Sequence, residues 1–227
     1  MHRDARGMWR SPLGCLPVDD EQASPPRRRA NTRARLLEAA VDVFARNGVA
    51  STTVDDLVAA AGYTRGAFYS NFSSMDEVFY ALFEARSSEM LEAVRQALAA
   101  IPREELSPDS VGRVIDAIEP AGRRWHILQA EFSLLAMRKP EARAAYRAFR
   151  SRFSAEFLEV TREALAAMGR RPVVPVEQIA EALAAIYVSS LTAETIEDDT
   201  LRPREALRSL VPAVLVGLSR EGTDGEG

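Results

Sequence analysis

Residues 64–71, TRGAFYSN, gather side chains that can hold a polyanion while carrying a single charge. The guanidinium of Arg65 can donate two parallel hydrogen bonds to a guanine edge or to a pair of phosphate oxygens. Gly66 has no side chain and lets the backbone approach a ligand closely. Hydroxyl and amide groups can bind phosphate oxygens without adding charge, and the segment supplies them from Tyr69, Ser70 and Asn71. The chemistry indicated is hydrogen bonding to nucleic acid.

Catalytic constellations are missing from the same sequence. It holds two histidines, His2 and His126, and one cysteine, Cys15. No nucleophile signature accompanies His126, and so few ligands form no metal cluster. The paired carboxylates at 104–105 and 198–199 fall in predicted loops, where they are ordinarily solvated. We therefore expect no enzyme, no metal and no cofactor; an enzyme would need a convergent acid–base site around His126.

Four helices are predicted around the opening segment. Apolar residues recur at helical spacing from 32 to 47, where Asn-Gly supplies the C-terminal turn. Thr52 or Thr53 can cap a second, short helix that stops at Gly62, and Thr64 caps a third that runs to about residue 71. Ser74 and Glu77 have the spacing of a capping box, which opens a long helix to about residue 100. Two short helices joined at a glycine predict a helix-turn-helix, with the helix 32–47 as the third wall.

Charge and composition fit a protein that meets a polyanion at one end only. The net charge of −4 is mild, but arginines are in excess before residue 72 and acids after it. Residues 1–30 are rich in proline and predicted to be disordered; the Arg27–Arg29 run is either a solvated charge run or a basic arm along DNA. One cysteine, a poor signal peptide and no apolar run of about 18 residues predict a cytoplasmic protein without a membrane span.

The rear of the chain is also predicted to be helical, with helices near 108–118, 123–138, 140–168, 176–196 and 203–219. No sustained alternation argues for a strand, and 173–176 is interpreted as an extended linker. The last two helices carry wide apolar stripes, which predict a four-helix dimer interface or ordinary core. Pro212 is expected to kink the last helix. The stripes are Ile179, Ala182, Leu183, Ile186, Tyr187, Ser190 and Leu191, and then Leu207, Leu210, Val211, Val214, Leu215 and Leu218.

The stretch TTVDDLVAAAGYTRGAFYSNFSSMDEVF resembles the DNA-binding signature of the TetR (tetracycline-repressor-type) family of transcriptional regulators. The resemblance covers residues 32–83: a Thr-Thr helix start, Ala-Gly at the turn, a hydroxyl-X-Gly opening of the recognition helix, and an aromatic-Tyr-X-X-Phe end. WHILQAEFSLLAMRKPEARAAY also resembles the corresponding region of some members. Two positions depart from the pattern. Met75 replaces a common phosphate-binding Lys, and Asn71 replaces a common His.

The resemblance implies an all-α fold with a three-helix DNA-binding domain and a helical ligand-binding and dimerisation domain. The expected boundaries are 1–30 for the tail, 31–75 for the DNA-binding domain, 76–220 for the second domain and 221–227 for a disordered end. The expected DNA-binding residues are Arg33, Thr53, Thr64, Arg65, Gly66, Ala67, Tyr69, Ser70 and Asn71.

Aromatic and polar residues of the rear helices are the candidates for an effector pocket. Such residues are more often plain core, since they dominate buried area. Gln129 shares a predicted face with Trp125 and is the best polar candidate, which favours a mainly hydrophobic effector. The expected ligand-binding residues are Met90, Trp125, Gln129, Phe132, Phe149 and Phe153.

The function expected from these observations is that of a ligand-responsive regulator, most simply a repressor. It would bind a near-palindromic double-stranded DNA operator as a homodimer and be released by a small effector. The alternative is a constitutive DNA-binding or architectural dimer whose rear core is filled. A closed, tightly packed centre would favour this alternative.

Overall fold

The computed structural model describes residues 25–196 and 201–222. Residues 1–24, most of the expected N-terminal tail, and 223–227 lie outside the described part. The first helix, α1 (Pro25–Asn47), begins earlier than expected, so residues 25–30 are helical and the predicted tail boundary at 30 is wrong. Proline is well tolerated in the first turn of a helix, where its missing N–H has no partner to lose. At the other end, Glu221 belongs to a strand and not to a disordered tail.

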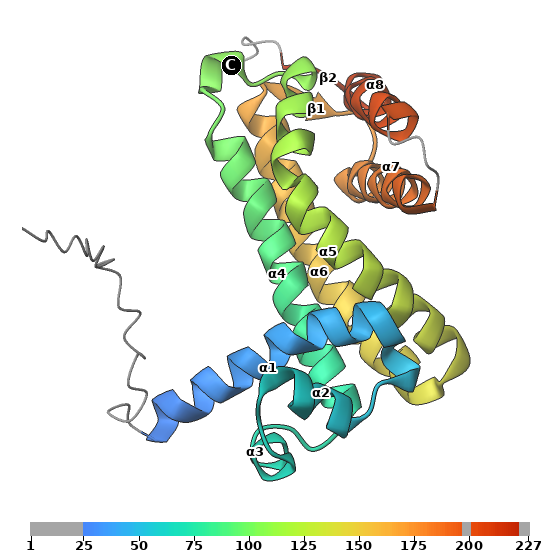
Figure 1. The fold of residues 1–227 in the computed structure, drawn as a ribbon. Helices are drawn as coiled ribbons and strands as arrows, with labels where there is room; N and C mark the ends of the chain where they lie inside the picture. Colours follow the sequence, from blue (N-terminus) through green and yellow to red (C-terminus); the bar gives the residue numbers. More distant parts are fainter. Residues whose placement is uncertain (1–24, 197–200, 223–227) are drawn as a thin grey trace, which may run out of the picture.

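Three helices form a head at one end of the molecule (Figure 1). After α1 and a single 3-10 turn, η2 (Val49–Ser51), come α2 (Val54–Ala61) and α3 (Arg65–Tyr69). Gly62 joins them with φ of 71°, a left-handed conformation that glycine adopts without strain. Thr64 caps α3, as the sequence predicts, and Thr53, one of the two predicted candidates, caps α2. The buried side chains of Leu36, Leu57 and Phe68 hold the head together.

The long helix α4 (Met75–Ala99) joins the head to the rest of the chain. Ser74 is its N-cap and accepts a hydrogen bond from the Glu77 amide at 3.1 Å. The predicted capping box is only half formed. The Glu77 carboxylate accepts from the amide and the hydroxyl of Ser73, both at 2.7 Å, one residue before the cap. These bonds, led by the backbone one, lower the pKa of Glu77.

Helices α5 (Val111–Arg138) and α6 (Pro140–Ala167) complete a column with α4, preceded by the turns η3 (Arg103–Glu105) and η4 (Pro108–Ser110). The sequence predicts two helices around Pro120, but α5 is continuous through it. Pro120 removes the donor to the Asp116 carbonyl. Asp116 and Pro120 lie on the exposed side of α5, where water can bond the Asp116 carbonyl. Ile118 and Trp125 on the opposite side are buried, and their packing keeps the two halves of the helix in line.

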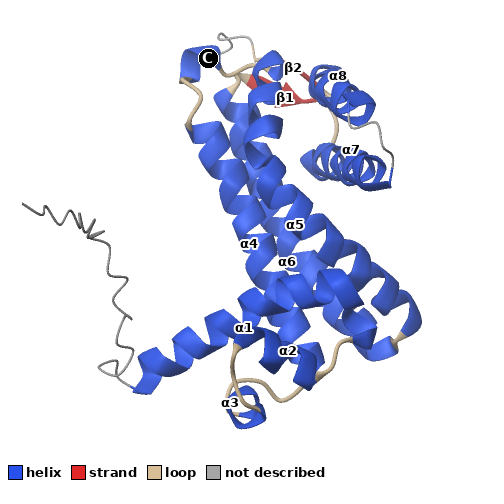
Figure 2. Cartoon of the chain, in the orientation of Figure 1, coloured by secondary structure: helices blue, strands red, loops and turns tan. Residues whose placement is uncertain are grey.

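The last helices, α7 (Val176–Ile196) and α8 (Leu201–Gly217), pack on each other beside the far half of the column. Two short strands, β1 (Arg170–Pro172) and β2 (Ser219–Glu221), pair antiparallel with Arg170 opposite Glu221 (Figure 2). The expectation of no strand is therefore wrong. Three residues are too few for a period-two pattern to show in the sequence. The fold is otherwise all-α, as predicted.

The core has two parts. The larger one runs from the head into the column through aromatic contacts, with ring centroids of Phe44 and Phe79 at 5.8 Å and of Phe79 and Phe132 at 5.2 Å. The smaller one lies between the start of α5 and the pair α7–α8, and includes Ile179 and Val211. The head is therefore packed onto α4 and α5 rather than tethered by a linker.

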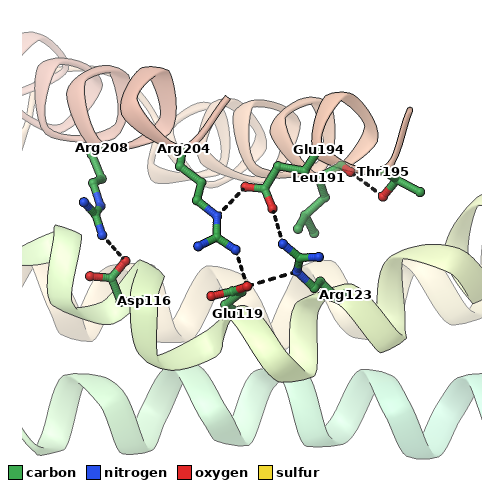
Figure 3. Close-up of polar contacts among 8 residues, drawn as sticks. All are labelled: Asp116, Glu119, Arg123, Leu191, Glu194, Thr195, Arg204 and Arg208. Carbon is green, nitrogen blue, oxygen red and sulfur yellow. Dashed lines mark hydrogen bonds and ion pairs between the residues drawn. The ribbon is translucent and has the colours of Figure 1, made fainter. Parts of the chain in front are cut away.

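A charged cluster ties α5 to α7 and α8 (Figure 3). Glu194 of α7 has only 5% of its side chain exposed and accepts from Arg123 at 3.1 Å, with Arg204 at 3.3 Å. Glu119 of α5 pairs with the same two arginines. Each carboxylate thus meets two guanidinium groups. Arg208 and Asp116 make a separate, exposed pair at 2.5 Å.

Among the described helices, α7 is the one whose length and apolar composition would suffice to cross a bilayer. A single such helix is weak evidence for a membrane protein, and core helices pass the same test. Here α7 packs against α8, α6 and α5 and carries Glu194 in the charged cluster. These contacts are those of a helix inside a globular domain.

Candidate functional site

The tip of the head presents α3 to solvent. Phe68 is fully buried beneath the helix, whereas its neighbour Tyr69 is 60% exposed and packs edge-on against the Phe68 ring at 5.1 Å. The Thr64 hydroxyl accepts the Ala67 amide at 3.2 Å and fixes the start of the helix. Consequently one face of this five-residue helix anchors it and the other face is free to meet a partner.

Arg65 does not point freely into solvent. Its Nε donates to Oδ1 of Asp55 at 2.5 Å, and its Nη2 donates to Oδ2. The pair joins the first turn of α2 to the first residue of α3. The hydrogen bonds from Arg65 lower the pKa of Asp55, and those to Asp55 raise the pKa of Arg65. The sequence does not predict this pair, because two residues ten positions apart across a turn leave no periodic signal.

The position of Gly66 needs no glycine for internal reasons. Its φ is not positive, and a Cβ built there would meet only the Thr64 hydroxyl, at 3.7 Å. The bare backbone faces open space at the tip of the head. A glycine at this position lowers the helix propensity of α3. Its benefit is that a partner molecule can approach the backbone closely.

Other predicted DNA-binding residues are also engaged within the protein. Thr53 forms the capping box of α2: its amide and hydroxyl both donate to the Asp56 carboxylate, at 2.9 and 2.7 Å, and lower the pKa of Asp56. The Asn71 amide group donates to the Ala67 carbonyl at 2.8 Å and to Ser70 at 3.2 Å. The Arg33 guanidinium lies 4.2 Å from the Phe72 ring centroid.

The predicted residues therefore divide by their exposure. Arg33, Ala67 and Asn71 are half-buried in or beside α3, with Arg33 donating to the Asn71 carbonyl at 3.4 Å. The exposed members form the open tip of the head: Thr53, Thr64, Arg65, Gly66, Tyr69 and Ser70.

An apolar cavity of about 140 Å³ lies in the rear of the molecule, between the column and the pair α7–α8. Of the predicted ligand residues, Met90, Trp125 and Phe153 line it. The Trp125 indole donates to the buried Ser87 hydroxyl at 2.9 Å and stacks on Phe153 with centroids at 5.6 Å. Tyr187 also lines the cavity, although the sequence predicts it only as part of an apolar stripe, at a dimer interface or in the core.

A larger groove of about 600 Å³ continues from the cavity along α6 and α7. Trp125 and Phe153 line both spaces, and Gln129 and Phe149 line the groove. Gln129 is held in a polar group, donating to Ser133 at 3.0 Å and facing Tyr146 at 3.5 Å. Phe132 is the predicted ligand residue that lines neither space. It is 1% exposed within the aromatic core, because its helical phase points it at Phe79 and Phe83 of α4.

The predicted dimer stripes are split between the core and the surface. Ile179, Leu207, Val211 and Leu215 are buried in the smaller core of this single chain. Apolar surface remains on the outside of the same helices, where Ile196 is 77%, Val216 52% and Leu210 48% exposed.

His126 carries no catalytic arrangement. It is 5% exposed, and its Nε2 lies 3.2 Å from the Thr192 hydroxyl, which itself donates to the Val188 carbonyl. Nε2 therefore carries the proton, and Nδ1 is buried with no partner among the described residues. Burial lowers the pKa of His126. The described residues also hold no group of three or more His, Cys, Asp or Glu arranged for a metal ion.

Comparisons with known proteins agree with this architecture. Curated relatives match part of the chain: the HTH-type transcriptional regulator AcrR of Shigella flexneri is 34% identical over 76 residues, and TtgR of Pseudomonas putida is 44% identical over 54 residues. The AcrR match covers 34% of this chain and 35% of AcrR, and the TtgR match covers 24% and 26%. The chain thus matches about a third or less of the length of these relatives.

Solved structures share the whole fold. A TetR-family regulator from Cytophaga hutchinsonii superposes with a TM-score of 0.68 at 18% identity, covering 86% of this chain and 98% of that one. GusR of Salmonella enterica gives 0.62 at 23% identity, covering 88% and 98%. At these identities the likeness concerns the fold alone.

Family models cover both parts of the chain. Residues 36–82 match the model described as bacterial regulatory proteins, tetR family, and residues 102–217 match the tetracyclin repressor-like C-terminal domain. The second match alone spans half of the sequence. The chain belongs to the TetR family of bacterial regulatory proteins.

Proposed function

We propose that this protein is a DNA-binding transcriptional repressor that acts as a homodimer and is released from a near-palindromic operator by a small, mainly hydrophobic effector. The observation that carries the proposal is the open tip of the head. There a capped α3 presents Arg65, the bare backbone of Gly66 and the exposed Tyr69 on a buried scaffold. An arginine, neutral donors and a closely approaching backbone are what a major groove and its flanking phosphates accept.

Dimerisation supplies the second recognition helix. A near-palindromic operator requires two heads, set about 34 Å apart or at a multiple of that distance. The exposed apolar side chains of Ile196, Leu210 and Val216 lie on α7 and α8, far from the head, and provide the surface for such a contact. With its two-fold axis along the length of the molecule, an isologous interface there would leave both heads facing the same side.

The apolar cavity supports an effector rather than a filled, constitutive core. A dry apolar cavity of about 150 Å³ in another protein binds benzene, and the cavity here has about 140 Å³. Met90 and Val94 of α4 line it, and α4 starts directly after the head. An effector that prefers one position of α4 would shift the head spacing by as much as its affinity differs between the two states.

Selection of genomic DNA fragments by the purified protein tests the DNA-binding function. We expect recovery of a small set of near-palindromic sites, and weaker binding to both specific and random DNA when Tyr69 is replaced by alanine, because phosphate contacts carry no sequence information. Failure to retain any duplex at low salt would overturn the proposal. Sedimentation at the same protein concentrations gives the oligomeric state.

Tryptophan fluorescence tests the effector function. The sequence has two tryptophans, Trp9 in the undescribed tail and Trp125 on the cavity wall. In a Trp9→Phe background, an apolar aromatic such as toluene is expected to change the Trp125 emission, and replacing Ala184 on the cavity wall with leucine should abolish that response. DNA binding that no compound of an apolar panel relieves would favour the constitutive alternative.

A further inference from the structure

Asp55 and Arg65 form the one ion pair within the described residues that links α2 to α3 at the tip of the head. The two side chains are 61% and 66% exposed, so the pair sits where the proposed DNA would lie. An exposed ion pair contributes little to stability. The effect of the pair on DNA recognition depends on which edge of the Arg65 guanidinium the Asp55 carboxylate occupies.

The carboxylate takes the side edge of the guanidinium. Nε–H and one Nη2–H of Arg65 point at Asp55. A guanidinium has five N–H groups in a rigid plane, so the second Nη2–H and one Nη1–H remain on the end edge, while the other Nη1–H points back toward Cδ. Guanine offers N7 and O6 as two adjacent acceptors in the major groove. Arg65 can therefore hold Asp55 with one edge and guanine with the other.

The carboxylate also selects between the two kinds of DNA acceptor. Phosphate is anionic, and its approach to Arg65 brings it close to the negative charge of Asp55. A guanine edge is neutral and meets no such repulsion. In addition, a side chain already held in one rotamer loses less conformational freedom on binding.

We propose that Asp55 is a positioning residue that fixes Arg65 for end-on recognition of one guanine in each half-site. The inference rests on the proposed DNA-binding function and adds to it a specificity device that spans both helices of the motif. Asp55 itself touches no base. Its removal is expected to redirect Arg65 from guanine to phosphate: base preference falls while sequence-independent affinity rises.

The test uses sites selected from a random duplex library by the wild-type protein. Wild type is expected to select a guanine that Arg65→Ala no longer selects. Asp55→Ala and Asp55→Asn should reduce the preference for that guanine by about tenfold, within the range that one bidentate pair confers. Both variants should bind random DNA more tightly. Replacing the guanine with 7-deazaguanine, which lacks the N7 acceptor, should weaken wild type more than Asp55→Ala.

Asp76→Asn is the charge-matched control, because Asp76 is an exposed carboxylate in the first turn of α4 and pairs with no recognition-helix arginine. It is expected to raise the affinity for random DNA without changing which base is preferred at each position of the site.

If wild type binds no duplex, the proposed function itself fails, and the inference with it. If wild type binds DNA but its guanine preference is independent of Arg65, or survives both Asp55 substitutions, the inference alone is overturned. Thermal unfolding of each variant separates these results from a loss of folding.

Discussion

The hydroxyl of Tyr187 on α7 packs directly against the backbone of Gly122 on α5. A Cβ added to Gly122 would lie 1.9 Å from that oxygen and 3.0 Å from Cζ of the same ring. The hydroxyl is buried and has no partner among the described residues, and burial raises the pKa of Tyr187 far above its ordinary value. One ring therefore lines the cavity and, at its tip, contacts α5 at Gly122.

Replacing Gly122 with alanine should destabilise the fold through this contact. Tyr187 would have to leave its place, and such overpacking costs about 1–3 kcal/mol. Tyr187→Phe removes the nearest atom and an unsatisfied hydroxyl, so it is expected to be neutral or stabilising. Urea unfolding of both single variants and the double variant checks this, with Tyr187→Phe restoring most of the loss. Additive effects would show that the two residues do not meet.

Acid should weaken the fold through His126. Its pKa is lowered in the folded state, because burial disfavours the charged imidazolium, while the unfolded chain keeps the ordinary value of 6.5. The unfolded state therefore binds more protons as the pH falls below 6.5, and stability decreases from there toward the folded pKa. Denaturant unfolding from pH 8 to pH 5 measures the slope. His126→Asn should flatten it over this window, and an unchanged slope would assign the effect to other groups.

The fold could be predicted from the sequence where local signals were strong. Caps at Thr53, Thr64 and Ser74 and the left-handed Gly62 placed three helix starts and one turn correctly. The predicted helix break at Pro120 is wrong. The effect of a proline depends on whether water can bond the carbonyl that loses its donor, and on whether side chains on the opposite face of the helix are packed. The strands were missed because three residues carry no periodicity, and their pairing joins positions about fifty residues apart, as Arg170 and Glu221 do.

The candidate site was predictable by residue type but not by partner. The sequence identifies Arg65 as a donor, but only the folded turn shows that Asp55 already holds one of its edges. Phe132 was expected at the effector pocket but lies in the aromatic core. Tyr187 was expected only in an apolar stripe of the last two helices but lines the cavity. Helical spacing assigns a residue to an apolar face but does not say whether that face meets a neighbouring helix, a cavity or a second chain.

The charged cluster of α5, α7 and α8 should be sensitive to loss of its buried member. Glu194→Gln keeps the shape but leaves Arg123 and Arg204 facing each other with only Glu119 between them. We expect a loss of about 1–2 kcal/mol, since charge-assisted bonds at a buried carboxylate are lost. The measurement is urea unfolding at low and at high salt.

The exposed pair of Asp116 and Arg208 is the matched control for this cluster. It joins α5 and α8, two of the three helices of the cluster, with half of each side chain in solvent. Asp116→Asn should cost less than about 0.5 kcal/mol, and salt should remove most of that. Equal costs for the two substitutions would mean that burial of Glu194 adds nothing to the cluster.

Substitution of Gly66 should separate folding from DNA binding. No atom except the Thr64 hydroxyl lies near a Cβ at this position, so the head can accept alanine without repacking. Alanine is favoured over glycine in a helix by about 0.5–1 kcal/mol, so Gly66→Ala is expected to raise the thermal midpoint slightly. The added methyl group would stand between the backbone and the DNA, and affinity for a selected site should fall.

Gly66→Val extends the same series, because its larger side chain should abolish docking while the head stays folded. Gly112→Val in the first turn of α5 is the control: a Cβ there meets nothing within 4 Å, and the position is remote from the tip of the head. Both valine variants bear the same cost of a β-branched residue in a helix. We expect filter retention to show loss of DNA binding in Gly66→Val alone, and circular dichroism to show that both variants stay folded. Full affinity in that variant would mean that the backbone of α3 never approaches DNA, and that recognition lies elsewhere on the head.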